Sequence, residues 1–198
     1  RHNTLNGTSL QECYTCLDAG TTSVTCSEAI NPYQCTGYVL PTEGEWEYAA
    51  RSGTLYDFWT PDGGGNYSST SCGDGVSDTT VTIVDGFTNP PLSDYAWFCG
   101  NRHDSIFTNT AKPVGLKLPN EFGLYDMHGN VWEWTTDSYG CSFSGNDDPY
   151  CSLQVGSNHV SRGGAWSSDA NAASASNSLD TSPSNTFFYI GFRLAFHP

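Results

Sequence analysis

The chain has few basic residues and no long apolar run. Only seven of its 198 residues are Lys or Arg, against 21 Asp or Glu, which gives a formal net charge of −14. Nucleic acids and anionic membrane surfaces attract basic proteins, so we expect neither as a partner. No stretch approaches the roughly 18 apolar residues of a membrane-spanning helix, so we expect no membrane insertion. Charged residues are only 14% of the chain while Gly, Ser, Thr and Asn are abundant, which is typical of a loop-rich extracellular domain.

Cysteine is not scarce. The chain has eight, an even number that indicates disulfides and an oxidising compartment. The Cys13-x-x-Cys16 spacing also occurs in zinc sites, but no second such pair and no matching pair of histidines accompanies it. Eight cysteines allow many pairings. We predict a nested pair followed by two local bridges: Cys13–Cys35 around Cys16–Cys26, then Cys72–Cys99 and Cys141–Cys151.

A length of 198 residues suits a single domain with a substantial core. The first residues, with Leu5 and Leu10 among asparagines, look like the end of a helix, so we expect the N-terminal part of the domain to be missing. Residues 11–37 show no helical periodicity. Thr42 and Glu45 form a capping box that predicts a helix to about Arg51, with Trp46, Ala49 and Ala50 facing inward.

Residues 52–92 form a long segment rich in Gly, Asp and Ser, interrupted by the apolar run Val81–Val84. Such segments in compact domains are usually surface insertions or binding loops, which is what we expect here. The acidic positions match no EF-hand spacing and are expected to be solvated. They are Asp62, Asp74, Asp78 and Asp85.

Glycines and aromatic residues are concentrated in the stretch Gly123–Trp134. If this stretch is extended, Trp132 and Trp134 share one face, and Val131 and Glu133 share the other. A carboxylate opposite two indoles is costly unless it is paired, hydrogen-bonded or bound to a cation. Glu133 therefore requires a partner.

Together with Leu40–Arg51, Arg162–Trp166 and Ile190–Leu194, this stretch resembles the formylglycine-generating-enzyme (sulfatase-modifying factor) family. That family is a branch of the C-type-lectin-like fold, and the resemblance covers about residues 33–198. It implies one α+β domain over residues 1–198, loop-rich, with few short strands and helices. The last two strands are expected at His159–Trp166 and Phe188–Phe196, with Trp166 and Phe192 in the core.

The enzymes of this family oxidise a substrate cysteine with a copper ion held by two cysteines. Residue-by-residue matching places these cysteines at Ser168 and Ala173, and neither can supply the thiolate that Cu(I) requires. We therefore expect no copper and no oxidase activity. The histidines show no ligand spacing and are expected to be structural or exposed. They are His2, His103, His128, His159 and His197.

The resemblance also implies a structural calcium ion. Its ligands would be the side chains of Asp126 and Glu133 and the backbone carbonyls of Gly129 and Val131. Carboxylates and carbonyls are the hard oxygen ligands that Ca²⁺ prefers. The alternative is that Asp126 and Glu133 only accept hydrogen bonds.

Residues 167–189 are small and polar and then abruptly aromatic, without helical or strand periodicity. Family members often carry Arg at the places of Ser174, Ser178 and Thr186, and all three are lost here. The segment resembles the variable region of diversity-generating-retroelement target proteins, in which adenine-directed mutagenesis of Asn codons scatters the ligand-binding residues. Every residue of the segment is reachable from such a codon, and Lys, Glu, Gln, Met and Trp are absent. An ordinary Ser/Asn-rich surface loop is the alternative.

These observations predict a non-enzymatic ligand-binding protein, secreted or displayed on a cell or virion surface, with a protein or surface ligand. Of the three aromatic residues that end the segment, we expect Phe188 to be buried. A formylglycine-generating or related oxidase, or a calcium-dependent sugar-binding lectin, are the alternatives. The predicted ligand-binding residues are Trp166, Ser167, Ser168, Asp169, Asn171, Asn177, Leu179, Thr181, Asn185, Phe187, Phe188 and Tyr189.

Overall fold

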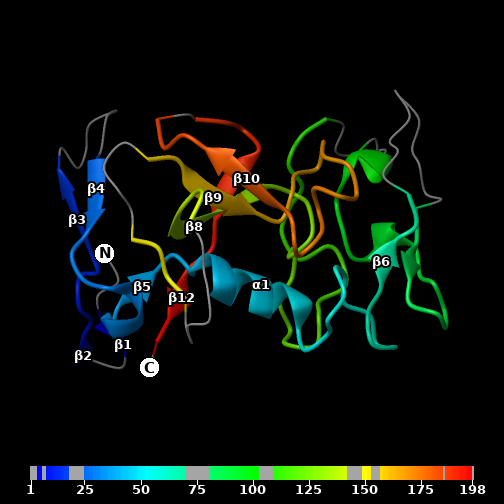
Figure 1. The fold of residues 1–198 in the computed structure, drawn as a ribbon, viewed down its shortest axis with the longest axis horizontal. Coiled ribbons are helices and arrows are strands. Elements are labelled where there is room, and N and C mark those ends of the chain that lie inside the picture. The colour runs from blue at the N-terminus through cyan, green and yellow to red at the C-terminus, as the bar shows by residue number, and fades with distance from the viewer. Residues whose placement is uncertain are drawn as a thin grey trace.

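A four-stranded sheet lies at the centre of the computed structural model, which describes residues 4–5, 8–17, 25–69, 81–102, 109–141, 149–152, 157–184 and 186–197. Its strand order is β10-β9-β8-β11. β9 is antiparallel to both of its neighbours, and β11 is parallel to β8. The strands are β8 (Trp132–Ser138), β9 (His159–Arg162), β10 (Ser178–Thr181) and β11 (Ile190–Phe192). The helix α1 (Glu43–Arg51) runs along one side of this sheet (Figure 1).

Short two-stranded pairs surround the sheet, as expected for a loop-rich α+β fold. They are β1 (Thr4–Leu5) with β2 (Thr8–Ser9), β3 (Tyr14–Leu17) with β4 (Thr25–Glu28), β5 (Tyr38–Val39) with β12 (Ala195–Phe196), and β6 (Asn66–Tyr67) with β7 (Ile83–Val84). Three 3₁₀ turns complete the described elements: η1 (Pro32–Gln34), η2 (Leu92–Asp94) and η3 (Cys99–Asn101). Figure 1 shows β3 and β4 at one end of the long axis and β6 at the other.

Three expectations about strands and helices were wrong. The N-terminal residues form the strand pair β1–β2, not the end of a helix. The strand expected at His159–Trp166 ends at Arg162, because Gly163 and Gly164 adopt φ values of 94° and 76° that no strand permits. The strand expected at Phe188–Phe196 is divided into β11 and β12, with Arg193 between them.

The prediction for α1 is confirmed. Thr42 caps the helix by accepting from Glu45 N, and the Glu45 carboxylate accepts from Thr42 N at 2.8 Å. Trp46 and Ala50 are buried against the sheet side, and Ala49 is partly buried. The helix therefore delivers one indole, Trp46, to the interior beside β8.

The described residues 52–69 and 81–92 supply much of the core, so the expectation of a surface insertion was wrong for them. Phe58, Ile83 and Leu92 have no exposed surface and pack in the main apolar cluster. Of the acidic positions, Asp62 is exposed, and Asp85 accepts hydrogen bonds from the backbone of its own turn at Phe87 and Asn89. Asp74 and Asp78 lie outside the described residues.

Three predicted disulfides are confirmed: Cys13–Cys35, Cys16–Cys26 and Cys141–Cys151. Cys16 and Cys26 lie directly opposite each other in β3 and β4. Because Cys13 and Cys16 belong to different disulfides, they are not half of a zinc site. Cys99 is also disulfide-bonded, and Cys72, its predicted partner, lies outside the described residues. Within the described part of the chain, no helix has the length and apolar character needed to span a membrane.

Candidate functional site

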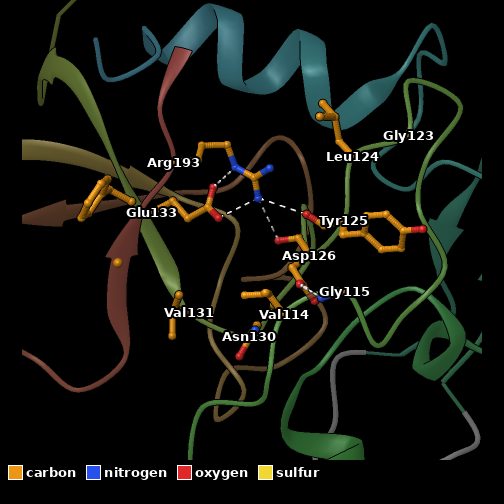
Figure 2. Close-up of a pocket in the computed structure, with 13 residues that line it drawn as sticks. Val114, Gly115, Gly123, Leu124, Tyr125, Asp126, Asn130, Val131, Glu133 and Arg193 are labelled. Carbon is orange, nitrogen blue, oxygen red and sulfur yellow. Dashed lines mark hydrogen bonds and ion pairs between the residues drawn. The ribbon is translucent and has the colours of Figure 1, made fainter. Parts of the chain in front are cut away.

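Strand β8 places Glu133 in the interior, where its side chain finds three donors. Glu133 is 7% exposed. Its Oε2 accepts from Trp46 Nε1 at 2.7 Å and from Arg193 Nε at 2.5 Å, and its Oε1 accepts from Arg193 Nη2 at 2.7 Å. The carboxylate–guanidinium contact is bidentate, the strongest geometry for such a pair. Figure 2 shows this fork. It supplies the partner that the sequence required for Glu133.

Arg193 also joins the end of the chain to the glycine-rich stretch. Its Nη2 lies 3.2 Å from the carbonyl oxygen of Tyr125 and 3.4 Å from that of Asp126 (Figure 2). Sequence reasoning assigned no role to this residue. The signal was available, because a buried carboxylate needs a cation or donors and the chain holds only seven basic residues.

Asp126 lies beside this ion pair in a left-handed conformation, with φ of 54°. Its Oδ2 accepts from Gly115 N at 2.7 Å, whereas its buried Oδ1 has no hydrogen-bond partner. Gly129, three residues on, crosses so close to the chain that an added Cβ would lie 1.8 Å from the carbonyl oxygen of Trp97. This crossing fixes the backbone that follows Asp126.

All four residues predicted to bind calcium line one pocket of about 480 Å³. Asp126 Oδ1 is unpartnered, and Glu133 Oε1, which accepts from Arg193 Nη2, has a second lone pair that could face a cation. Among the described residues, no three His, Cys, Asp or Glu side chains are grouped as a metal site, so carbonyl ligands would have to complete it. The donors present fit a hard cation. Calcium at Asp126, Gly129, Val131 and Glu133 therefore stays a prediction.

The segment 167–189 is held through its main chain. Cys99 N donates to Ser168 O at 2.9 Å, His128 Nδ1 lies 2.9 Å from Ala173 O, and Ala175 N donates to Asp57 O at 3.0 Å. β10, inside the segment, pairs with β9. The sequence of the segment showed no strand periodicity, so β10 was not predicted. Its four residues pair through backbone groups, which a search for apolar periodicity does not detect.

Arg162 is the most extensive of these anchors. Its Nη1 donates to Ala175 O at 2.7 Å and to Asn177 O at 3.2 Å. Its Nη2 pairs with Glu43 at 2.7 Å and Glu47 at 2.8 Å on α1. The guanidinium therefore connects the helix to the main chain of the segment.

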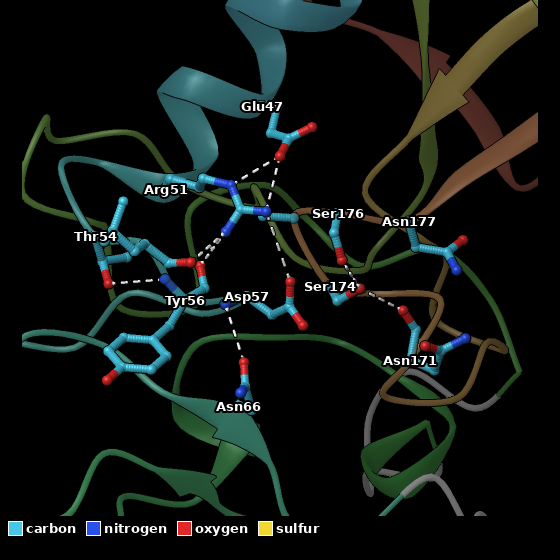
Figure 3. A network of polar contacts seen from close by, with 12 residues as sticks. Glu47, Arg51, Thr54, Tyr56, Asp57, Asn66, Asn171, Ser174, Ser176 and Asn177 are labelled. Atoms are coloured by element: carbon cyan, nitrogen blue, oxygen red, sulfur yellow. Dashed lines mark hydrogen bonds and ion pairs between the residues drawn. The ribbon is translucent and has the colours of Figure 1, made fainter.

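A second network lies at the C-terminal end of α1. Arg51 pairs with Glu47 at 2.8 Å and lies 3.8 Å from Asp57. Figure 3 shows this arginine between the two carboxylates, with Asn171 and Ser174 on the neighbouring segment. Ser174 Oγ donates to Asn171 O at 2.7 Å. Together with the Ala175–Asp57 backbone contact, this network fixes the position of the segment beside the helix.

The predicted ligand-binding residues differ widely in exposure. Trp166 and Thr181 are buried, at 6% and 3% exposed, and Asn185 lies outside the described residues. The buried positions also include Ala170, Ala173 and Ala175, which was not expected of a loop. Exposed are Ser167, Asn171, Phe187 and Phe188, and partly exposed are Ser168, Asp169, Asn177, Leu179 and Tyr189.

The aromatic residues form one cluster. Phe187 and Tyr189 are stacked, with centroids 4.9 Å apart and planes at 10°, and Phe188 lies edge-on to Tyr189 and 6.3 Å from Trp166. Phe188 is 76% exposed, so the expectation that it is buried was wrong. It precedes β11 in a turn closed by Ile190 N and Phe187 O, where strand alternation does not apply. Phe192, on the edge strand β11, was expected in the core and is 65% exposed, so that expectation was wrong.

The places of the family's copper ligands are structural here. Ser168 Oγ accepts from Ala165 N at 3.1 Å, and Ala173 is fully buried. Burial lowers the pKa of His128 to about 4. His159 packs edge-on against Trp134, and His197 contacts Glu45. The three described histidines therefore serve the fold, whereas His2 and His103 lie outside the described residues.

Comparison with curated proteins finds relatives of the kind that the sequence indicated. A formylglycine-generating enzyme of Thermomonospora curvata is 30% identical over 193 residues, covering 88% of this chain and 54% of that protein. Chaperone protein LppX of Paenibacillus barcinonensis is 32% identical over 156 residues, covering 78% of this chain and 45% of the other. An inactive C-alpha-formylglycine-generating enzyme 2 of Bos taurus is 32% identical over 104 residues, covering 52% of this chain and 28% of that protein. The chain spans about half, or less, of the length of these relatives.

Solved structures agree with these matches. Treponema denticola variable protein 1 superposes with a TM-score of 0.65 at 28% identity, covering 96% of this chain and 63% of that one. PvdO from Pseudomonas aeruginosa superposes with a TM-score of 0.59 at 26% identity, covering 80% of this chain and 52% of that one. The first match supports the resemblance to variable proteins, and both confirm the fold. The sulfatase-modifying factor enzyme 1-like domain family matches residues 11–198, and the chain therefore belongs to this family and has its C-type-lectin-like α+β fold.

Proposed function

We propose that the chain is a non-enzymatic binding module that displays a diversified ligand face, built from residues 167–189, on a fixed scaffold. The main-chain anchoring of this segment carries the proposal. The groups that hold it act on backbone atoms of Ser168, Ala173, Ala175 and Asn177. Because every amino acid offers the same carbonyl, exposed side chains can change while the backbone stays in place.

The exposed side chains suit recognition. Phe187, Phe188 and Tyr189 offer rigid aromatic area, and Asn171 and Ser176 offer adaptable hydrogen-bonding groups. Antibody loops use the same combination of aromatic anchors with small polar residues. The three described disulfides support an oxidising compartment, and we propose secretion or display on a surface.

The relatives named as formylglycine-generating enzymes support the enzymatic alternative. Ser168 and Ala173 weigh against it, because neither can bind copper as a thiolate. The test is a copper assay of the purified protein, together with mass spectrometry of a Cys-x-Pro-x-Arg peptide after incubation. We expect no bound copper and no formylglycine above a no-protein control. Turnover above that control would favour the enzyme.

Two display libraries test the binding proposal directly. The first randomises the exposed positions Asn171, Ser176, Phe187 and Phe188, and the matched control randomises the buried Ala170, Ala173 and Ala175. We expect most members of the first library to resist protease and to yield binders against a chosen protein target. Most control members should unfold, because added side-chain volume strains a packed core. If both libraries unfold equally often, or the first yields no binders, the proposal fails.

A further inference from the structure

A second, smaller pocket lies where α1 ends. Its lining comes from the turn after the helix, from residues 59–63 and from Glu121, and includes no residue of segment 167–189 or of the predicted calcium site. Its volume is about 150 Å³, below the roughly 300–1,000 Å³ of sites for drug-sized ligands, so it suits a single ring or a single side chain. Figure 3 shows the lining residue Thr54 on the opposite side of Arg51 from Asn171.

The walls of this pocket are held by contacts within the fold. Thr54 Oγ1 donates to Gly63 O at 2.6 Å, and Gly63 N donates to Thr60 O at 3.1 Å. Trp59 is partly exposed and packs edge-on against Tyr95, with ring centroids 6.3 Å apart and planes at 70°. The pocket is therefore formed without a ligand, and binding would require little further ordering of the chain.

Two polar side chains of the lining have unused hydrogen-bonding capacity. Ser52 is 2% exposed and its Oγ accepts from Phe122 N at 3.0 Å, but in the described part of the chain nothing accepts its own proton. A buried donor without an acceptor is unfavourable. Glu121 is exposed, and no described residue donates to its carboxylate. The pocket therefore offers a ligand one hydroxyl donor, one carboxylate acceptor and the indole of Trp59.

This combination selects the chemistry of the ligand. Glu121 is the only charged residue among the described residues of the lining, and the chain carries −14, so an anion is repelled. An ammonium group has donors only and would leave the proton of Ser52 without an acceptor. A sugar hydroxyl both donates and accepts, and the C–H face of a pyranose ring can pack on an indole. We propose that this pocket binds one neutral pyranose ring, stacked on Trp59, with its hydroxyl groups at Ser52 and Glu121 and without a metal ion.

An exposed aromatic pair beside the pocket suits a longer glycan. Tyr48 and Phe122 are 68% and 48% exposed, and their ring centroids lie 5.7 Å apart. Phe122 follows Glu121 directly in the chain, so a second sugar unit leaving the pocket would meet these rings. Exposed apolar side chains grouped in this way favour a ligand that covers them. The proposal does not depend on the binding function proposed for segment 167–189.

The test is a titration of ¹⁵N-labelled protein in a metal chelator, with the methyl pyranosides of glucose, galactose and mannose as probes. The amide signals of Gly53 and Gly63 and the indole signal of Trp59 report on the pocket. We expect at least one pyranoside to shift all three signals in a saturable way. Tetrahydropyran, the same ring without hydroxyl groups, and the ammonium of Nα-acetyl-lysine methylamide should leave the signals unchanged.

Two variants with matched controls localise the binding. Glu121→Ala removes an exposed carboxylate and should weaken binding about tenfold, whereas Asp180→Ala, at an exposed carboxylate in β10, should have no effect. Trp59→Ala should abolish binding, whereas Trp134→Ala, at another partly exposed indole, should not. Because Glu121 is exposed, its variant keeps the test decisive even if Trp59→Ala fails to fold.

Several outcomes would overturn the proposal. They are that no pyranoside shifts the three signals, that shifts appear only after calcium is added, that tetrahydropyran or the ammonium probe binds equally well, or that Glu121→Ala binds like the wild type. None of the probes requires segment 167–189, so each of these outcomes would leave the proposed function standing.

Discussion

Two buried ionisable groups should have opposite effects on how the free energy of unfolding depends on pH in the acidic range, so that their effects nearly cancel. Replacing either group alone should reveal the effect of the other, and the two substitutions should change the slope in opposite directions. Asp137 in β8 has no exposed surface, and this burial raises the pKa of its carboxyl from 3.8 to about 6. The hydrogen bonds from Glu43 N and Cys151 N act in the opposite direction and lower the pKa, but burial is the larger effect. His128 is 5% exposed, and burial lowers the pKa of its imidazole from 6.5 to about 4.

The two groups affect stability with opposite sign. The folded state holds the Asp137 proton more tightly than the unfolded state, so its contribution is present below about pH 4 and is lost as the pH rises through about 6. The unfolded state takes up the His128 proton more readily, so that contribution is present above about pH 6.5 and is lost as the pH falls to about 4. Each difference of roughly two pH units corresponds to about 3 kcal/mol.

The assay is urea denaturation, followed by tryptophan fluorescence, at several pH values between about 4 and 7. As the pH falls across this range, the free energy of unfolding of Asp137→Asn should decrease by about 3 kcal/mol more than that of the wild type. The reason is that the effect of His128 is then no longer offset by that of Asp137. His128→Gln can still donate to Ala173 O, and its free energy of unfolding should rise relative to the wild type by a similar amount as the pH falls. Burial also lowers the pKa of His159, a background that all three proteins share, so the slopes are compared with the wild type. Parallel profiles for the three proteins would refute the reasoning.

Three further outcomes are expected. Trp166 is 6% exposed, and Trp166→Ala should lower the free energy of unfolding by about 3–5 kcal/mol. Phe188 is 76% exposed, and Phe188→Ala should lower it by under about 0.5 kcal/mol. Equal losses for the two variants in urea denaturation would contradict the placement of the two rings. Reduction should lower the melting temperature clearly, since losing a native disulfide in a small secreted domain costs about 2–5 kcal/mol, and eight free thiols on titration of the non-reduced protein would contradict the pairing. Calcium at about 100 times its Kd should add roughly 2.7 kcal/mol of stability, and Asp126→Ala should abolish the gain; an unchanged melting temperature in chelator would mean that Asp126 and Glu133 only accept hydrogen bonds.

The local features of this chain were predictable from its sequence. The helix follows from the Thr42–Glu45 capping box, which needs only neighbouring residues. The nested cysteine pairing was predicted as one of many possible pairings, and Cys16 and Cys26 face each other across a hairpin. The family motifs singled out Asp126 and Glu133, which line one pocket, and their role as calcium ligands stays a prediction.

The remaining features depend on contacts between distant residues. Phe58, Ile83 and Leu92 face inward because bridges such as Phe58–Gly65 and Thr82–Pro91 set their backbones, and no periodicity records this. The pairing of Glu133 with Arg193 joins residues sixty positions apart. Phe188 was misplaced because alternation was applied before the residue at which the strand begins.

The segment 167–189 travels from one edge of the central sheet to the other. It follows β9, forms β10 on the outer side of that strand, and leads into β11 on the far side of β8. Its ends are tied by Trp166 N to Asn130 O and by Tyr189 O to Trp132 N, both at 2.8 Å. An inserted or deleted residue within β10 would shift the β9–β10 register and turn inward side chains outward. This arrangement accepts substitutions more readily than insertions or deletions. Relatives that diversify this surface should therefore differ by substitution, with an unchanged number of residues between the two backbone hydrogen bonds.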